Sequence, residues 1–318
     1  MTRLRYAVVL VSVVLFTLAL GIALGGGPLQ GQVRGTLQSQ VEAVTDGAGQ
    51  RSLVSRNRAL ARTARFDRGF AEAVSPQLLE DRLTERSVVV LSLPGVPAAV
   101  TEAVAADIDT AGGTVTTSLQ VGRDLVDPTA RPLVDELSKR LLADLDDRDV
   151  PDDASVYTRA GVVAARALLT TADAGNPMDD AARSVFNTLT TARLLHGPEP
   201  QQRASTAVVL LPEARRRPGA TSGGRSLILT ELVTAFDEAG DGVVVGGPPS
   251  AAQPRGLLAA LRRTAPAAEQ VSTVDSTGVR AGQVVAVLAL AEQAEGSTGH
   301  YGVAPGADAV LPADALTE

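Results

Sequence analysis

Side chains that could hold a soft metal ion are scarce in this chain of 318 residues. There is no cysteine, and the only methionines are Met1 and Met178. The histidines are His196, in LLHGPEP, and His300, in GHYGVAPGA. Soft metal ions prefer thiolate and thioether ligands, and imidazole suits several of them. His300 and His196 are therefore weak metal-ligand candidates, and a tight site would need both of them to meet Met178.

The predicted helices argue against such a meeting. Met178 precedes a helix predicted over 179–195, and His196 follows its end. If that helix is continuous, its rise separates the two residues by about 27 Å. His196 is then better placed to cap the last carbonyls of the helix than to bind a metal or catalyse. No tight metal site and no resident cofactor are expected.

Three further stretches have compositions that could do chemistry. DLDDRDVPDD, at 144–153, has carboxylates that suit hard cations but lacks the glycine and final glutamate of an EF-hand, which favours a solvated connection over a metal site. Arginines 215–217 could touch anionic head groups, although a solvated loop is favoured. GVVVGGPPS, at 242–250, lacks both GxGxxG and a P-loop lysine, which favours a tight turn over a nucleotide site.

Enzymatic chemistry has little support. With no cysteine and no GxSxG motif, the chain offers no recognisable nucleophile. The formal net charge is −7 and no concentrated basic face is visible, so no nucleic-acid partner is expected. Without cysteine there are no disulfides, and with 3% aromatic residues the core must be aliphatic. The sequence therefore predicts a non-enzymatic protein that is stabilised by packing alone.

Hydrophobic periodicity predicts the elements that must position these residues. Five aliphatic runs bounded by turn residues predict strands at 87–93, 114–121, 205–212, 271–276 and within 242–250. Helices are predicted at 97–113, 131–147, 155–173, 179–195, 225–240, 254–264 and 280–296. Alternating strands and helices predict an α/β fold, with a mostly parallel sheet, helices on both faces and a helical insertion at about 131–195.

An uncharged run from residue 6 to residue 24 predicts a membrane segment. Its 19 residues span roughly 28 Å as a helix, close to the thickness of a hydrocarbon core. This length favours an uncleaved anchor over 1–27, while the small residues of Ala23-Leu24-Gly25 keep a cleaved signal peptide open. Arg3 and Arg5 precede the run, which predicts a single pass with a cytoplasmic N-terminus and the bulk of the chain outside.

A helical stalk is predicted between the anchor and the α/β domain, over residues 28–72. After a first apolar stripe, a second one has spacings of 4, 3 and 4 and consists of Leu53, Asn57, Leu60 and Ala64. A narrow seam of this kind, with Asn57 able to fix register, favours a parallel coiled coil over a helix that lies on the domain. Glycines 47 and 49 are expected to interrupt the helix. The α/β domain would then occupy 74–318, and the partners would be membrane lipid and a second copy or another coiled-coil protein.

Several stretches taken together resemble one known family. They are ALGGGPLQ, PQLLEDRLTERSVVVLSLPG, GVVVGGPPS, GLLAALRR, VSTVDSTGVRAGQVVAVLALAEQ and GHYGVAPGADAVLP. In this order they resemble the mycobacterial copper transport protein B family over nearly the whole chain. The resemblance implies a membrane or cell-envelope protein with a role in copper efflux or copper tolerance, described at times as an outer-membrane channel.

Two functions stay open on the sequence. One is copper handling, by transport or through partners, as the resemblance implies. The other is a coiled-coil scaffold that positions cell-wall or division enzymes in the envelope, which the anchor, the seam and the scarcity of metal ligands favour.

Overall fold

A computed structural model describes residues 47–145, 150–151, 153–214 and 222–316. The chain divides into two units, residues 1–66 and residues 67–318. Helix α3 (Gly47–Leu79) begins in the first unit and ends in the second. The remaining elements all belong to the second unit.

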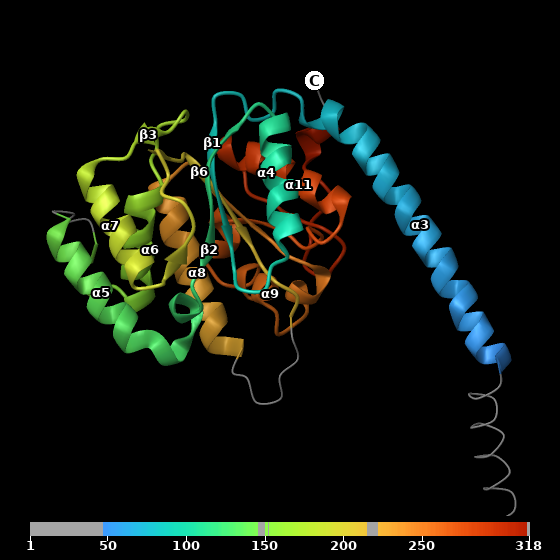
Figure 1. Ribbon diagram of the computed structural model, residues 1–318, viewed down its shortest axis with the longest axis horizontal. Helices are drawn as coiled ribbons and strands as arrows, with labels where there is room; N and C mark the ends of the chain where they lie inside the picture. The colour runs from blue at the N-terminus through green and yellow to red at the C-terminus, as the bar shows by residue number, and fades with distance from the viewer. Residues whose placement is uncertain (1–46, 146–149, 152, 215–221, 317–318) are drawn as a thin grey trace, which may run out of the picture. The chain divides into compact units, whose positions relative to one another are not determined.

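The second unit alternates strands with helices, as Figure 1 shows. The strands are β1 (Ser87–Ser92), β2 (Thr114–Val121), β3 (Asn176–Pro177), β4 (Leu195–His196), β5 (Gln202–Arg203), β6 (Thr206–Leu210), β7 (Val243–Gly246), β8 (Ser272–Val274) and β9 (His300–Tyr301). The helices are α4 (Ala98–Thr110), α5 (Arg131–Asp144), α6 (Val156–Leu168), α7 (Asp180–Thr191), α8 (Ser222–Ala239), α9 (Leu257–Leu261), α10 (Ala267–Gln270) and α11 (Arg280–Ala294).

Seven of these strands form one sheet in the order β4-β2-β1-β6-β7-β8-β9. All neighbours pair in parallel except β2 and β4, which are antiparallel. The chain moves outward from β1 to β2 and then returns past β1 to β6, so the direction of winding reverses between β1 and β6. This is the arrangement of a doubly wound α/β sheet.

Side chains that alternate along β1 define the two faces of the sheet. Val88 and Val90 are fully buried in a cluster with residues of α4 and α11, whereas Val89 and Leu91 are buried in a cluster with residues of α5 to α9. In Figure 1, β1 and β6 accordingly run between α4 and α11 on one side and α6 and α8 on the other. A strand that is buried on both faces needs a continuous apolar run, and SVVVLS supplies it.

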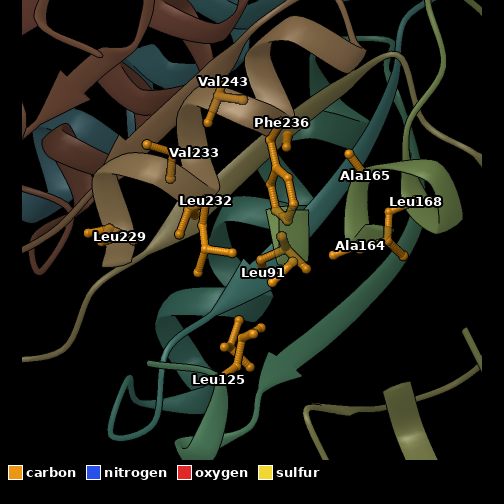
Figure 2. Packing of buried hydrophobic residues seen from close by; sticks show 14 of the residues in the cluster. Leu91, Leu125, Ala164, Ala165, Leu168, Leu229, Leu232, Val233, Phe236 and Val243 are labelled. Atoms are coloured by element: carbon orange, nitrogen blue, oxygen red, sulfur yellow. The ribbon is translucent and has the colours of Figure 1, made fainter. Parts of the chain in front are cut away.

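Helix α6 packs into the larger cluster beside α8. Figure 2 shows Phe236 of α8 close to Leu91 of β1, with Ala164, Ala165 and Leu168 of α6 next to them. Small residues on α6 allow close approach: a Cβ at Gly161 would lie 2.7 Å from the Cβ of Ala235. The segment between β2 and β6 therefore contributes directly to the core on this face of the sheet.

The structure confirms the predicted α/β fold with its mostly parallel sheet and the five predicted strands. These strands are β1, β2, β6, β7 and β8, with β2 matching its predicted bounds at both ends. Helix α4 ends before Gly112, whose φ of +80° suits the glycine that was expected to close it. The α/β character was predictable because each central strand is a run of β-branched residues.

Two of the predicted helices end four or five residues earlier than expected, and two edge strands were not predicted. The helix expected at 155–173 ends at Leu168, because Leu169 is extended and bridges to Ala204. The helix expected at 179–195 ends at Thr191, because Arg193 has a φ of +58° and Leu194 N–H donates to the Leu189 carbonyl at 2.9 Å. The unpredicted strands β4 and β9 form the two edges of the sheet.

The expectation that glycines 47 and 49 interrupt the stalk stays a prediction, because α3 begins at Gly47 and the first stripe, which they would separate from it, lies before the described residues. The predicted membrane segment at 6–24, the first apolar stripe and arginines 215–217 fall outside the described residues. Within the part of the chain that the structure describes, no helix has the length and apolar character needed to cross a membrane.

Candidate functional site

The three candidate soft-metal ligands lie in three separate places. Met178 is buried in the larger core cluster. His196 is exposed on edge strand β4, and His300 is buried on edge strand β9. Seven strands at about 4.8 Å spacing put the two sheet edges roughly 29 Å apart. The two imidazoles therefore cannot share one metal ion.

The prediction that His196 follows directly on the end of a helix is wrong. Helix α7 ends five residues earlier, at Thr191, and His196 pairs with Gln120 of β2 in antiparallel register. The helix also begins after Met178, at Asp180, with the Asp179 side chain accepting from the Ala182 N–H at 2.7 Å. The separation of Met178 and His196 is therefore set by the packing of the core and the sheet edge, not by one continuous helix.

His300 is held in a polar cluster at the opposite edge. Its Nδ1 lies 3.1 Å from the Thr273 hydroxyl, and its backbone N–H donates to Asp308 at 3.1 Å. Burial lowers the pKa of the imidazole, and the neighbouring Arg262 lowers it further, while Asp308 acts in the opposite direction. The ring is therefore neutral near neutral pH, and its Nδ1 is already occupied by a protein partner.

A buried ion pair forms the centre of this cluster. Arg262 donates from Nη1 to Asp275 at 2.9 Å, from Nε to Thr273 at 2.8 Å and from Nη2 to the Tyr301 carbonyl at 3.0 Å. The Arg262 side chain is 3% exposed and that of Asp275 is fully buried. Asp275 also accepts from the backbone N–H groups of Val303 and Ala304. Buried charges need this degree of pairing.

The chemistry of this cluster is structural. Every polar atom named above faces a protein partner, and a Cβ at position 302 would lie 2.1 Å from an Asp275 carboxylate oxygen, so only glycine fits beside it. The cluster fixes β9 and the chain that follows it against β8. Sequence reasoning missed Arg262 and Asp275, although an arginine in a predicted helix and an aspartate at the end of the last predicted strand were the available signal.

The other stretches singled out from the sequence offer no ligand site among the described residues. Pro249 begins a short 3-10 turn, Pro249–Ala252, directly after β7, as expected for a tight connection. Half of the acidic stretch at 144–153 lies outside the described residues. Among the described residues, no group of three His, Cys, Asp or Glu side chains could hold a metal ion. An apolar cavity of about 10 Å³ beside Val134 and Leu189 has room for one water at most.

The predicted seam lies on the exposed surface of α3. Leu53 is 59% exposed and Leu60 is 61% exposed, and both Asn57 and Ala64 are also exposed. Phe66, in the same unit, is 73% exposed. Large apolar side chains at regular helical spacing are rarely left in water over such a length. Pairing of this seam with another helix stays a prediction.

Comparison with known proteins gives one consistent result. The family model described as "Copper transport outer membrane protein, MctB" matches residues 1–312. Proteins named "Copper transporter MctB" from Mycobacterium bovis and from Mycobacterium tuberculosis are 24% identical to this chain over 327 residues. The match covers 98% of this chain and 99% of each relative.

The family model covers nearly the whole chain, and the relatives align from end to end, so the resemblance seen in the sequence is confirmed. The chain belongs to the MctB family of copper transport outer membrane proteins.

Proposed function

We propose that this protein acts in copper efflux or copper tolerance in the cell envelope, and that it does so without enzymatic chemistry. Membership of the MctB family and the names of the mycobacterial relatives support the link to copper. The polar side chains of the His300 cluster face one another, which supports a structural role for the most elaborate polar network described above.

The observation that carries the mechanism is the separation of the soft ligands. Met178 lies in the core, and the two histidines lie on opposite edges of the sheet. A tight Cu(I) centre without thiolate needs several thioether or imidazole ligands within bonding distance. The second unit, residues 67–318, is called the α/β unit from here on. Its arrangement supports copper handling through assembly or partners. Copper would then be the cargo of that assembly and not an ion that this unit holds permanently.

A second candidate function is the envelope scaffold. The exposed residues Leu53 and Leu60 favour it, because they lie seven residues apart on one face of α3 and offer a helix partner an apolar surface. The partner would be a second copy of the chain or another coiled-coil protein. The two functions are compatible, since a copper-handling assembly also needs a means of association.

Anchoring is part of the proposal. We place a single membrane pass at residues 6–24, with the N-terminus in the cytoplasm and the rest outside. Reporter fusions after Leu29 should then be active outside the cytoplasm, and the N-terminus of the mature protein should lie near Met1. A mature N-terminus near Gly26 would replace the anchor with a cleaved signal.

A deletion strain separates the copper role from the scaffold role. Copper handling predicts growth arrest at copper concentrations that the parent tolerates, whereas a pure scaffold role predicts defective cell separation with unchanged copper tolerance. Complementation with His196→Ala/His300→Ala should restore tolerance, because the separated imidazoles do not form the copper site. Complementation with Leu60→Glu should fail, whereas Ala59→Glu, an exposed neighbour off the seam, should succeed.

A further inference from the structure

The first unit carries a local concentration of positive charge in a protein that is acidic as a whole, contrary to the expectation that no basic face is present. Between residues 52 and 66 there are four arginines and no acidic residue, while the formal net charge of the chain is −7. The four are Arg56, Arg58, Arg62 and Arg65, and all are exposed on α3. Among the described residues none of them lies in an ion pair, and Arg62 Nε donates to the Arg58 carbonyl at 3.3 Å.

Three of these arginines form one stripe along the helix, which we call the arginine stripe: Arg58, Arg62 and Arg65. Their spacings of 4 and 3 put them on a common face. At about 100° per residue, the stripe lies roughly 120° to 180° around the helix from Leu53. The stripe and the apolar seam are therefore on different faces of α3, and a partner on one leaves the other free.

Phe66 extends the same side of the helix. It follows Arg62 by four residues, so the two side chains are neighbours on the surface, and it is 73% exposed. Cationic residues beside an exposed aromatic ring are the pattern of helices that lie at a membrane interface. An acidic protein surface would form ion pairs with the arginines but would not bury the aromatic ring of Phe66 in an apolar environment.

Several arginines in the second unit have structural partners. Arg262 pairs with Asp275, Arg280 pairs with Asp107, and Arg159 pairs with Asp135 at 2.6 Å. These guanidinium groups stabilise the fold by joining elements. The arginine stripe has no such structural partner, so its charges are available to a ligand outside the chain.

We propose that the arginine stripe binds an anionic phospholipid surface. Guanidinium groups match phosphate oxygens in geometry and charge, and each basic residue near an anionic membrane strengthens attachment. The predicted membrane segment ends at residue 24, which is 34 residues before Arg58. Even fully extended, a tether of this length confines the stripe to within about 120 Å of the bilayer. A second attachment of α3 to lipid would leave the seam facing away from the membrane.

The chain has no cysteine, so a single introduced cysteine can be labelled at one known position. Ser55 lies seven residues before Arg62 and shares its face of the helix. An environment-sensitive fluorophore attached to the thiol of Ser55→Cys therefore reports on the surroundings of the arginine stripe. The full chain is reconstituted into vesicles of phosphatidylcholine alone or mixed with phosphatidylglycerol. We expect a blue shift in the anionic vesicles that high salt reverses. The same label at Ser297→Cys, on the exposed surface of the second unit, should not respond.

Charge variants identify the residues responsible. Arg58→Gln/Arg62→Gln/Arg65→Gln should lower the equilibrium constant for membrane binding of the helix about a hundredfold, from roughly fivefold for each basic residue. The matched control Arg123→Gln/Arg140→Gln/Arg255→Gln makes the same charge change at exposed sites of the second unit and should leave the shift intact. Lysine at all three stripe positions should retain it, and circular dichroism checks that each variant keeps its helix content.

Three results would overturn the proposal. One is an equal signal in neutral and anionic vesicles. Another is a shift that survives the triple glutamine substitution, which would assign the contact to Phe66 or to the seam. The third is a shift with soluble polyglutamate but none with vesicles, which would assign the stripe to an acidic protein.

Discussion

The α/β unit and the exposed part of α3, residues 52–66, treat the same residue types in opposite ways. In the α/β unit Leu258 and Leu261 are fully buried, and Arg262 has three protein partners. In the helix Leu53 and Leu60 are more than half exposed, and the arginines have no carboxylate partner among the described residues.

This difference separates residues that stabilise the fold from residues that are available for binding. Folding favours the pairing of buried charges and the burial of apolar surface. Contacts within the α/β unit therefore explain why Leu258, Leu261 and Arg262 lie where they do. The helical segment leaves large apolar side chains in water, which costs free energy unless a partner covers them, and leaves its arginines solvated and without a carboxylate partner among the described residues. We therefore propose that α3 has the association function, while the contacts described for the sheet stabilise the fold.

The largest predicted effect comes from the buried ion pair. Arg262→Ala leaves Asp275 buried without its cation and should lower the free energy of unfolding by about 3–5 kcal/mol. The neighbouring exposed arginine is the control: Arg263→Ala should change it by less than about 0.5 kcal/mol. Chemical denaturation measures both. Equal losses in the two variants would mean that the cluster at the β8–β9 edge does not hold the fold.

Truncating one leucine in each region sharpens the comparison. Leu258→Ala creates a cavity in the core and should cost about 3 kcal/mol in the free energy of unfolding. Leu60→Ala removes an exposed side chain and should leave that free energy within about 0.5 kcal/mol while it weakens self-association. Denaturation and sedimentation together measure the pair. A Leu60→Ala variant that unfolds easily but associates normally would show that this leucine stabilises the fold and does not serve association.

A half-buried carboxyl of the α/β unit predicts a pH dependence. Burial raises the pKa of Asp237 from 3.8 to about 6, although the Val243 backbone N–H acts in the opposite direction. The folded state therefore holds this proton more tightly than the unfolded chain does. The resulting stabilisation is complete below about pH 4 and is lost as pH rises through about 6.

Asp237→Asn tests that dependence. At pH near 7 the variant should be more stable than the parent by on the order of 1–2 kcal/mol, since partial exposure screens the full effect. Near pH 4 the two proteins should unfold alike. The measurement is a denaturation series across this pH range, and a constant difference at every pH would assign the effect to packing and not to titration.

The smallest predicted effect concerns the specificity of the seam. Asn57→Leu should tighten association by about 1 kcal/mol, because an apolar residue replaces a polar one at a seam position, while it relaxes register or partner choice. Disulfide trapping through single cysteines at Ala64 reports the register. Tighter association with an unchanged register would show that Asn57 does not fix the register of the paired helices.

Local patterns predicted the centre of the sheet better than its edges. The run SVVVLS fixes its own strand, because consecutive β-branched residues that are buried on both faces favour no other element, and TVTTSLQV, which is only partly buried, is rich in β-branched residues that favour a strand. Strands β4 and β9 are two residues long and depend on a neighbour for every hydrogen bond, so no local pattern marks them. The helix ends at Leu168 and Thr191 were missed for a similar reason, since tertiary pairing and a left-handed residue terminate them.

The candidate site was predictable only in part. The seam residues follow from helical spacing, and their exposure agrees with an association surface. The partners of His300 come from β8 and from the chain around α9, and only the folded sheet brings Thr273 and Arg262 to its ring. The pairing of residues distant in sequence is a property of the topology, which spacing alone does not encode.

Titration of the full chain against a competing Cu(I) chelator tests the central claim most directly. The separated positions of Met178, His196 and His300 predict that the protein takes no tightly bound equivalent of Cu(I) from the chelator. The contradictory result is one tight equivalent that His196→Ala or His300→Ala abolishes. That outcome would make copper a resident ligand of the α/β unit and would displace assembly through α3 as the basis of its function.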